Sequence, residues 1–280
     1  MITTYRSPGT ACYSSRVSDI FRDHLLRGKV AFITGGGSGI GQTIAQRLAQ
    51  HGAAVTLAGR RQEKLDAAAS AIRDAGGAAA TAAHDVRDYA SLETALRTTR
   101  ENSGEIDILL CAAAGNFPAP VTGMSANGFK AVIDIDLLGT FNTCRAAFEF
   151  LKKPGASVIS ISAAHARIPI ANQAHVCAAK AGIELLMQTL ALEWGPSGVR
   201  CNCITPGPTD DTEGMRRLAP SEEDRRRVLR NVPLGRFGTR DELADLALFL
   251  CSPAASYITG SVFNCDGGSS LTRFNLPAAH

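Results

Sequence analysis

The sequence predicts an α/β fold: one doubly wound domain with a seven-stranded, mainly parallel sheet and helices on both faces. Short apolar runs alternate with amphipathic helical stretches along most of the 280 residues. A glycine cluster joins the first apolar run to the first helical stretch, and no internal repeat or linker divides the chain. Strands that alternate with helices favour a parallel sheet, because each helix crosses the sheet between two strands.

The expected elements follow one another in a regular order. The first strand is KVAFIT at 29–34, and the helix after it carries Ile40, Ile44 and Leu48 at helical spacing. The other strands are short apolar runs, expected at 53–59, 78–86, 106–115, 156–162, 198–206 and near 260–268. The other helices are expected at 61–77, 89–104, near 126–152, at 172–194 and at 240–250.

Composition excludes several classes of function. The charge balance of 29 basic and 26 acidic residues gives +3, too small to indicate nucleic-acid binding. No apolar run approaches the roughly 20 residues that cross a bilayer, so we expect no membrane association. The N-terminus lacks the features of a secretion signal, and we expect a cytoplasmic protein. The eight cysteines form no CxxC pair and lack histidines at ligand spacing, so we expect buried thiols and no metal site.

Residues 1–27 are expected to be an N-terminal extension, and residues 28–280 the domain. The extension is polar, and four of its apolar residues would order it by packing: Ile20, Phe21, Leu25 and Leu26.

The segment TGGGSGIG at 34–41 lies between the first strand and the first helix. Gly35, Gly39 and Gly41 permit a tight turn there and let the helix N-terminus approach a pyrophosphate, whose charge the free amides and the helix dipole stabilise. This position in an alternating α/β chain predicts a dinucleotide site in a Rossmann-like domain.

The second expected strand ends in Arg60 and Arg61. NAD-specific sites usually place there an acid that accepts from the ribose 2′-hydroxyl, whereas forked guanidinium donors suit a 2′-phosphate. The sequence therefore favours NADP(H), with a solvated helix start as the alternative interpretation. Asp85, after the third strand, is placed to accept from the adenine amino group.

Four motifs together resemble the short-chain dehydrogenase/reductase family over about residues 28–270: the glycine segment 34–41, Lys180 at the head of a helix, PGP at 206–208 and DGG at 266–268. The resemblance implies a single Rossmann-like domain, often assembled as a homotetramer. It also implies hydride transfer between a nicotinamide cofactor and a carbonyl or an alcohol.

The family's usual catalytic set is only partly present. Counting from Lys180, the tyrosine position holds Val176 and the serine position holds Ala163. The asparagine position, in an Asn-x-x-Gly pattern that ends at Gly139, holds Asp136. A ketone reductase without its general acid would lose roughly 10² to 10⁴ in rate. Conjugate reduction fits better, since the proton then arrives at carbon. His175 precedes the vacant position by one residue and is either a proton relay or a residue of helix packing or capping.

Several segments are similar to the 2,4-dienoyl-CoA reductases, in particular the peroxisomal type: CAAAGNF at 111–117, FKAVIDIDLLGTFN at 129–142, AHVCAAKAG at 174–182 and PGPTDDTEGMRRL at 206–218. This resemblance implies NADPH-dependent reduction of a 2,4-dienoyl-CoA to a 3-enoyl-CoA in unsaturated fatty acid breakdown. Asp136 would hold the water that supplies the proton, Lys180 would bind the nicotinamide ribose, and Asn116 would donate to the thioester oxygen.

The resemblance also implies further binding residues. Contacts to the NADP(H) cofactor are expected from Ser38, Ile40, Val86, Ala113, Lys180, Pro206 and Gly207. Contacts to the acyl-CoA are expected from Phe117, Ser125, Asn127 and Arg217, although a serine before a helix is also an ordinary cap. Residues 206–235 would form a mobile lid over the substrate.

Two other functions remain open at this level. One is a short-chain reductase that acts on a ketone or a different enoyl thioester with His175 or water as the acid. The other is a catalytically silent NADP(H)-binding protein. Asp136, the GNF segment and the TEGMRRL segment argue against both, and most directly against the silent protein, which has no need for acyl-CoA features.

Overall fold

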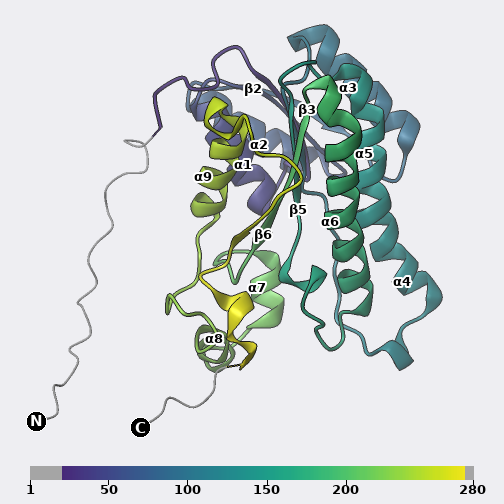
Figure 1. Ribbon diagram of the computed structural model, residues 1–280, viewed down its shortest axis with the longest axis vertical. Helices are drawn as coiled ribbons and strands as arrows, with labels where there is room; N and C mark the ends of the chain where they lie inside the picture. Colours follow the sequence, from purple (N-terminus) through teal and green to yellow (C-terminus); the bar gives the residue numbers. More distant parts are fainter. Residues whose placement is uncertain (1–20, 275–280) are drawn as a thin grey trace, which may run out of the picture.

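The computed structural model describes residues 21–274, apart from the side chains of Glu213, Arg217, Leu218, Arg273 and Phe274 (Figure 1). Its strands form one seven-stranded sheet in the order β3-β2-β1-β4-β5-β6-β7, and each pairing in that sheet is parallel. The expected fold class is confirmed, with a sheet that is wholly parallel. The strands are β1 (Val30–Thr34), β2 (Ala54–Gly59), β3 (Ala78–Ala83), β4 (Ile108–Cys111), β5 (Ser157–Ile161), β6 (Arg200–Pro206) and β7 (Val262–Cys265).

Helices cover both faces of the sheet (Figure 1). On one face lie α1 (Gly39–Gln50), α2 (Gln62–Asp74) and α9 (Arg240–Cys251), and on the other lie α3 (Tyr89–Ser103), α5 (Gly139–Ala147) and α6 (Ala174–Trp194). Strand β1 contributes to the hydrophobic cores on both faces of the sheet. Ala31 and Ile33 pack in the core with α1, α2 and α9, and Val30 and Phe32 pack in the core with α3, α5 and α6. Alternate residues of a strand point to opposite faces, so a strand covered on both sides is apolar throughout.

The long helix expected near 126–152 is not one regular α-helix. It begins as α4 (Ala126–Val132), widens into a π-helical turn (Ile133–Leu138), continues as α5 and ends in a 3₁₀ turn (Phe148–Phe150). Such π turns within α-helices often occur at functional sites. The apolar spacing of the segment did not reveal the change, because the chain stays helical throughout.

The described part of the N-terminal extension packs on the domain. Leu26 is buried in the core beneath α1, and Phe21 and Leu25 pack against the same core. Ile20 and the residues before it lie outside the described chain. Packed structure therefore begins some residues ahead of the expected start at 28.

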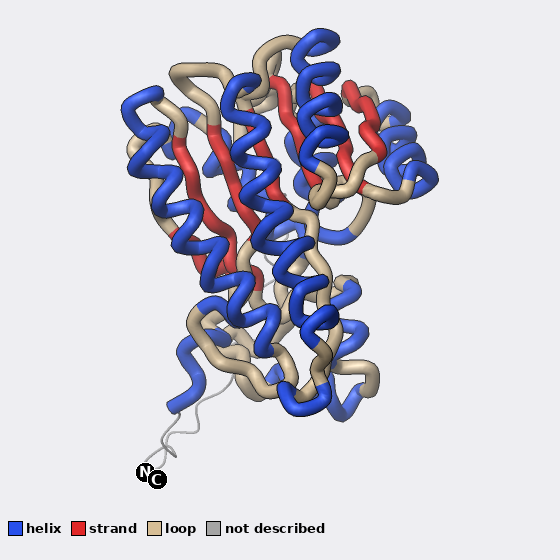
Figure 2. Tube along the Cα trace, turned by 90° about the vertical axis from the view of Figure 1, so that its right-hand side faces the viewer, coloured by secondary structure: helices blue, strands red, loops and turns tan. Residues whose placement is uncertain are grey.

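The expected lid segment contains two short helices, α7 (Glu213–Leu218) and α8 (Glu222–Leu229). They lie beyond one end of the sheet, where loops and short helices gather (Figures 1 and 2). Helix α8 buries none of its residues, so its charged side chains face the solvent. Further 3₁₀ turns occur at Val121–Gly123, Ala164–Ala166, Gly195–Ser197, Pro253–Ala255 and Ser269–Phe274.

The thiols of Cys111, Cys144, Cys201 and Cys203 are buried as expected, and those of Cys177, Cys251 and Cys265 are half-buried. Cys201 and Cys203 point from alternate positions of β6 into the core shared with α5 and α6. Burial raises the pKa of the Cys203 thiol to about 12, so this side chain behaves as an apolar group.

In the described range 21–274, no helix is both long enough and apolar enough to span a membrane.

Candidate active site

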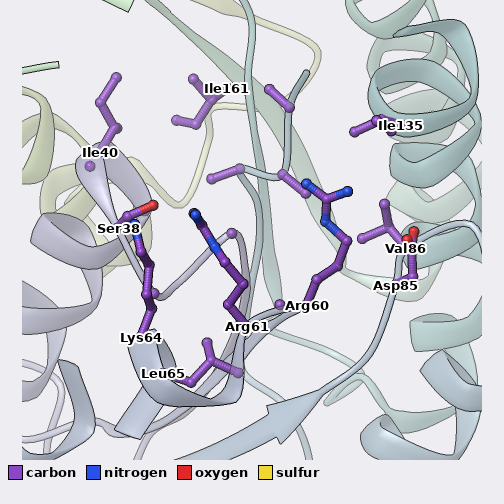
Figure 3. A pocket seen from close by; sticks show the side chains of 18 of the residues that line it. Ser38, Ile40, Arg60, Arg61, Lys64, Leu65, Asp85, Val86, Ile135 and Ile161 are labelled. Atoms are coloured by element: carbon purple, nitrogen blue, oxygen red, sulfur yellow. The ribbon is translucent and has the colours of Figure 1, made fainter. Parts of the chain in front are cut away.

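A cavity opens at the carboxyl ends of β1 to β5, next to the β1–β4 pair at which the strand order reverses. Ligands of doubly wound sheets bind at such a reversal. Ten residues expected at the cofactor line this cavity: Gly35, Ser38, Gly39, Ile40, Gly41, Arg60, Arg61, Asp85, Val86 and Ala113. The sequence did not indicate other residues on its wall, among them Lys64, Leu65, His84, Ile135, Ile161 and Thr212 (Figure 3).

The glycine segment folds so tightly that side chains would not fit. A Cβ added to Gly35, which has φ +70°, would lie 2.6 Å from the carbonyl oxygen of Ala112, and one added to Gly41 would lie 2.6 Å from that of Gly35. The close approach holds the first turn of α1 against the end of β4 and leaves its N-terminus facing the cavity. Ser38, at the N-cap, makes no capping hydrogen bond with its side chain to the described chain. The segment can therefore receive a pyrophosphate.

Cationic groups gather where β2 meets α2. Arg60 and Arg61 end the strand, Lys64 lies in the first turn of the helix, and the three side chains extend toward the same space (Figure 3). Near Arg60, Asp85 accepts hydrogen bonds from the Arg87 guanidinium at 2.6 and 3.0 Å (Figure 3). These bonds hold the pKa of Asp85 at about 2. Since Arg87 offsets the charge of Asp85, this end of the cavity favours a phosphate.

Asp136 and Lys180 form a buried ion pair. Their exposed fractions are 1% and 6%, and Lys180 Nζ lies 3.2 Å from Asp136 Oδ2. The backbone N–H of Gly115 donates to Asp136 Oδ1 at 2.7 Å, and Lys180 Nζ donates to the carbonyl oxygen of Ile161 at 3.1 Å. Asp134, by contrast, is partly exposed and pairs with Lys130.

The π turn and a glycine of α6 together make this pair possible. A Cβ at Gly182 would lie 2.9 Å from Leu137 Cδ2, so α6 packs closely on the π turn only because Gly182 lacks a side chain. Lys180 is two residues before Gly182, and Asp136 is one before Leu137. The close contact of the two helices therefore brings the ammonium and the carboxylate together.

Several buried polar atoms of the π turn, the β5–α6 loop and the start of α6 have no hydrogen-bond partner in the described chain. They are Asp136 Oδ2, both ring nitrogens of His165 and of His175, and Gln173 Oε1. Burial, and then the charge of Lys180, lower the pKa of His165. Buried polar groups in folded proteins are almost always hydrogen-bonded. Such a concentration of unsatisfied atoms is typical of a site that receives a ligand or ordered water.

No tyrosine of residues 21–274 replaces the missing acid. Val176 fills the expected tyrosine position and is 4% exposed, and Ala163 stands at the serine position. The hydroxyl of Tyr89 bonds to Arg145, and Tyr257 is fully exposed beside the 3₁₀ turn that follows α9. The two remaining tyrosines, 5 and 13, lie outside the described residues.

His175 is fully buried, and its ring lies edge-on to that of Phe117 with the centroids 4.5 Å apart. This position agrees with the helix-packing interpretation of His175. It also places Phe117 against Val176 and Ala179 of α6, on the helix that carries Lys180. Asn116, next to Phe117, is exposed.

The other residues expected at the substrate are spread more widely. Ser125 is the N-cap of α4 and accepts from Gly128 N at 3.0 Å, as an ordinary helix cap does, and Asn127 is exposed. Arg217 belongs to α7, but its side chain lies outside the described residues. Pro206 and Gly207 were expected at the cofactor. Pro206 ends β6, and Gly207 packs so closely on Asp266 that a Cβ would lie 2.4 Å from the Cα of Asp266.

Comparisons with known proteins agree with this geometry. A family model described as enoyl-(acyl carrier protein) reductase matches residues 35–270. The chain is 42% identical over 252 residues to the peroxisomal 2,4-dienoyl-CoA reductase of Saccharomyces cerevisiae, named as (3E)-enoyl-CoA-producing, covering 89% of this chain and 86% of the relative. It is 43% identical to the protein of the same name in Danio rerio, over 93% of this chain and 88% of the relative.

A relative from Bacillus subtilis is 39% identical over 88% of this chain and 98% of its own. It is named a probable 2,4-dienoyl-CoA reductase that produces (2E)-enoyl-CoA. Among solved structures, a short-chain dehydrogenase from Bacillus anthracis matches with a TM-score of 0.79 and 38% identity, over 88% of this chain and 98% of that chain. The family model, the relatives and the shared fold agree: the chain belongs to the short-chain dehydrogenase/reductase family, a family of oxidoreductases.

Proposed function

We propose that this protein reduces 2,4-dienoyl-CoA to 3-enoyl-CoA with NADPH, as part of unsaturated fatty acid breakdown. The observation that carries the proposal is the buried Asp136–Lys180 pair, next to a valine where a ketone reductase of this family needs its tyrosine. The names of the relatives, which describe 2,4-dienoyl-CoA reductases, support the same reaction.

The cavity fits NADP(H). The glycine segment 34–41 leaves room for the pyrophosphate, and Arg60, Arg61 and Lys64 would bind the 2′-phosphate. Lys180 would bind the nicotinamide ribose, with Val86, Ala113, Pro206 and Gly207 against the remainder of the cofactor. When bound, NADPH would supply the hydride.

Asp136 and Lys180 then act on the substrate. As hydride adds at C5, the electrons of the diene move toward the thioester oxygen, where Lys180 and Asn116 stabilise the negative charge. A water held by Asp136 gives a proton to C2, which leaves the remaining double bond between C3 and C4. Asp136 Oδ2 suits this role, because it is buried beside the Lys180 ammonium, at 3.2 Å, and no further donor of the described chain binds it.

The remaining proposals concern substrate binding. Phe117 would form a wall of the acyl channel, and Ser125, Asn127 and Arg217 would contact the acyl-CoA, with residues 206–235 as a lid.

We also propose a homotetramer. Large apolar side chains are exposed along α5, the π turn and α6, and these support self-association: Leu138, Phe141, Leu185 and Leu192. The expected cytoplasmic location stays a prediction, since the names of the first two relatives refer to peroxisomes.

The test mixes purified protein, NADPH and a 2,4-dienoyl-CoA, follows the absorbance of cofactor and diene, and identifies the product by mass spectrometry after chromatography. Asp136→Asn should lower kcat by about 10² to 10⁴, because it removes the group that positions the proton donor. Asp134→Asn is the matched control: it lies two residues away, faces outward, and should retain nearly normal activity.

Near-normal turnover by Asp136→Asn would reject its assignment. A 2-enoyl-CoA product would support the reductase activity but would show that the proton enters at C4 and not at C2. The name of the Bacillus subtilis relative implies this product for that protein. A parallel assay with a 3-ketoacyl-CoA detects a carbonyl reductase. Tight NADPH binding without turnover of either substrate would indicate a silent binding protein.

A further inference from the structure

Helix α6 carries a second buried acid that the proposed mechanism does not use. Glu184 is 7% exposed and lies four residues after Lys180. Residues four apart share one face of an α-helix, so the two side chains point toward the same side of α6. Burying an ionised carboxylate is costly unless hydrogen bonds and an opposite charge accompany it.

Three donors satisfy this carboxylate. The hydroxyl of Ser162 donates to Oε1 at 2.8 Å, and that of Thr205 donates to the same oxygen at 3.3 Å. The guanidinium of Arg167 donates to Oε2 at 2.9 Å. Ser162 directly follows β5 and Thr205 belongs to β6, so Glu184 ties α6 to the ends of two neighbouring strands.

The Lys180 contact lies beside the Glu184 contact. Lys180 Nζ donates to the carbonyl oxygen of Ile161, the residue before Ser162. One turn of α6 therefore holds two adjacent residues at the end of β5, through Lys180 at one end of the turn and Glu184 at the other. Two such attachments restrict both the rotation and the sliding of α6, and they fix where the Lys180 ammonium meets Asp136.

Arg167 connects the same carboxylate to the loop between β5 and α6. It ends the 3₁₀ turn Ala164–Ala166, which carries His165 with its unsatisfied ring nitrogens. The Arg167 side chain is 53% exposed, so its ion pair adds little to global stability. Its consequence is local: it fastens the middle of the loop to α6 one turn from Lys180.

We propose that Glu184 and Arg167 are positioning residues, which clamp the β5–α6 loop on α6 and thereby set the place of Lys180 relative to Asp136. The proposal rests on the proposed reduction for its kinetic consequence, but not for the clamp itself. Small displacements of a catalytic group are costly: about 1 Å can reduce a rate about 100-fold.

The experiment compares Glu184→Gln, Arg167→Gln, Arg167→Lys and the Glu184→Gln/Arg167→Gln double variant with the unsubstituted protein. Glu184→Gln keeps an oxygen acceptor for Ser162 and Thr205 but loses the charge opposite Arg167. Each Gln variant should lower kcat for the dienoyl-CoA about 10- to 100-fold. The Kd for NADPH should rise by a smaller factor, because Lys180 is one of several residues proposed to bind the cofactor. The double variant should be no worse than the singles, because the two residues share one interaction.

Hydrogen exchange of peptides covering 162–172 measures the clamp without any substrate. Exchange should accelerate in both Gln variants and return toward normal in Arg167→Lys, which keeps the charge. Glu193→Gln, an exposed acid further along α6, is the control and should change neither exchange nor kcat.

Unchanged exchange in 162–172, or additive losses of kcat in the double variant, would overturn the proposal. Parallel losses of kcat and of NADPH affinity would also overturn it, since they indicate general damage to the fold. If the unsubstituted protein turns over no dienoyl-CoA, the proposed reduction fails while the exchange result still decides whether the clamp exists.

Discussion

Lys64 lies in the first turn of α2, on the same cavity wall as Arg60 and Arg61. Arg60 and Arg61 could be identified from the sequence, because they directly follow a strand whose end is a known place for ribose recognition. Lys64 could not be singled out among the polar residues of a helix start. Its spacing of three from Arg61 was the available signal, since residues three apart are neighbours on a helix.

Replacing Arg61 or Lys64 by glutamine should weaken NADPH binding about 10- to 100-fold, the loss expected when a charged hydrogen bond is removed. NADH lacks the 2′-phosphate, so its affinity should stay within about twofold. Calorimetric titration with both cofactors measures the difference. Arg73→Gln, in the last turn of the same helix, should affect neither. Equal losses of affinity for NADPH and NADH would show that these cations do not bind the 2′-phosphate.

Among the elements, the π turn Ile133–Leu138 has the largest effect on the site. It carries Asp136 inward and Leu137 onto Gly182, and the next residue after the turn, Gly139, lies against Val86 of the cofactor cavity. A Cβ at Gly139 would lie 2.5 Å from Val86 Cγ2. The π turn and the residue after it therefore connect Asp136 to the wall of the cavity by direct contact.

Gly139→Ala should destabilise the protein by about 1–3 kcal/mol, the usual cost of overpacking a core, and should also weaken NADPH binding by displacing Val86. Urea unfolding and cofactor titration measure the two effects. Gly195→Ala is the matched control, because Gly195 has helical φ −52° and no atom within 4 Å of an added Cβ. An alanine at Gly139 that leaves both stability and affinity unchanged would disprove the tight contact.

At the scale of the whole molecule, hydrophobic cores hold the sheet between its helices, and burial also acts on ionisable groups near the site. His84 is 6% exposed, stacks on Phe32 and lines the cofactor cavity. Burial lowers the pKa of His84, and also that of His165 in the β5–α6 loop, from 6.5. The folded protein thus keeps both imidazoles neutral at a pH where the unfolded chain protonates them.

The free energy of unfolding should therefore fall as the pH drops below about 6.5, because the unfolded state then binds more protons than the folded state. Urea unfolding at pH 7.5 and 5.5 measures this decrease, in a range above the ordinary titration of carboxylates. His84→Gln and His165→Gln should each reduce the pH dependence. His24→Asn, at an exposed turn, should leave it unchanged. Equal pH dependence in all four proteins would contradict the assignment.

The sequence by itself determined the order of strands and helices, the parallel sheet, the glycine turn and the vacant tyrosine position. These features depend on local periodicity or on fixed spacing along the chain, such as the four residues between Val176 and Lys180. Asp136 could be identified in the same way, since its place is set by the count to Gly139.

Only the tertiary structure decided which polar groups lie together inside. The ion pair of Asp136 with Lys180, the contact of Gly182 with Leu137, and the bonds of Glu184 join residues that are far apart in the chain or on different elements. Burial and hydrogen-bond satisfaction are properties of the packed arrangement of elements. A one-dimensional pattern predicts which face of a helix is apolar, but not which buried oxygen or nitrogen is left without a partner.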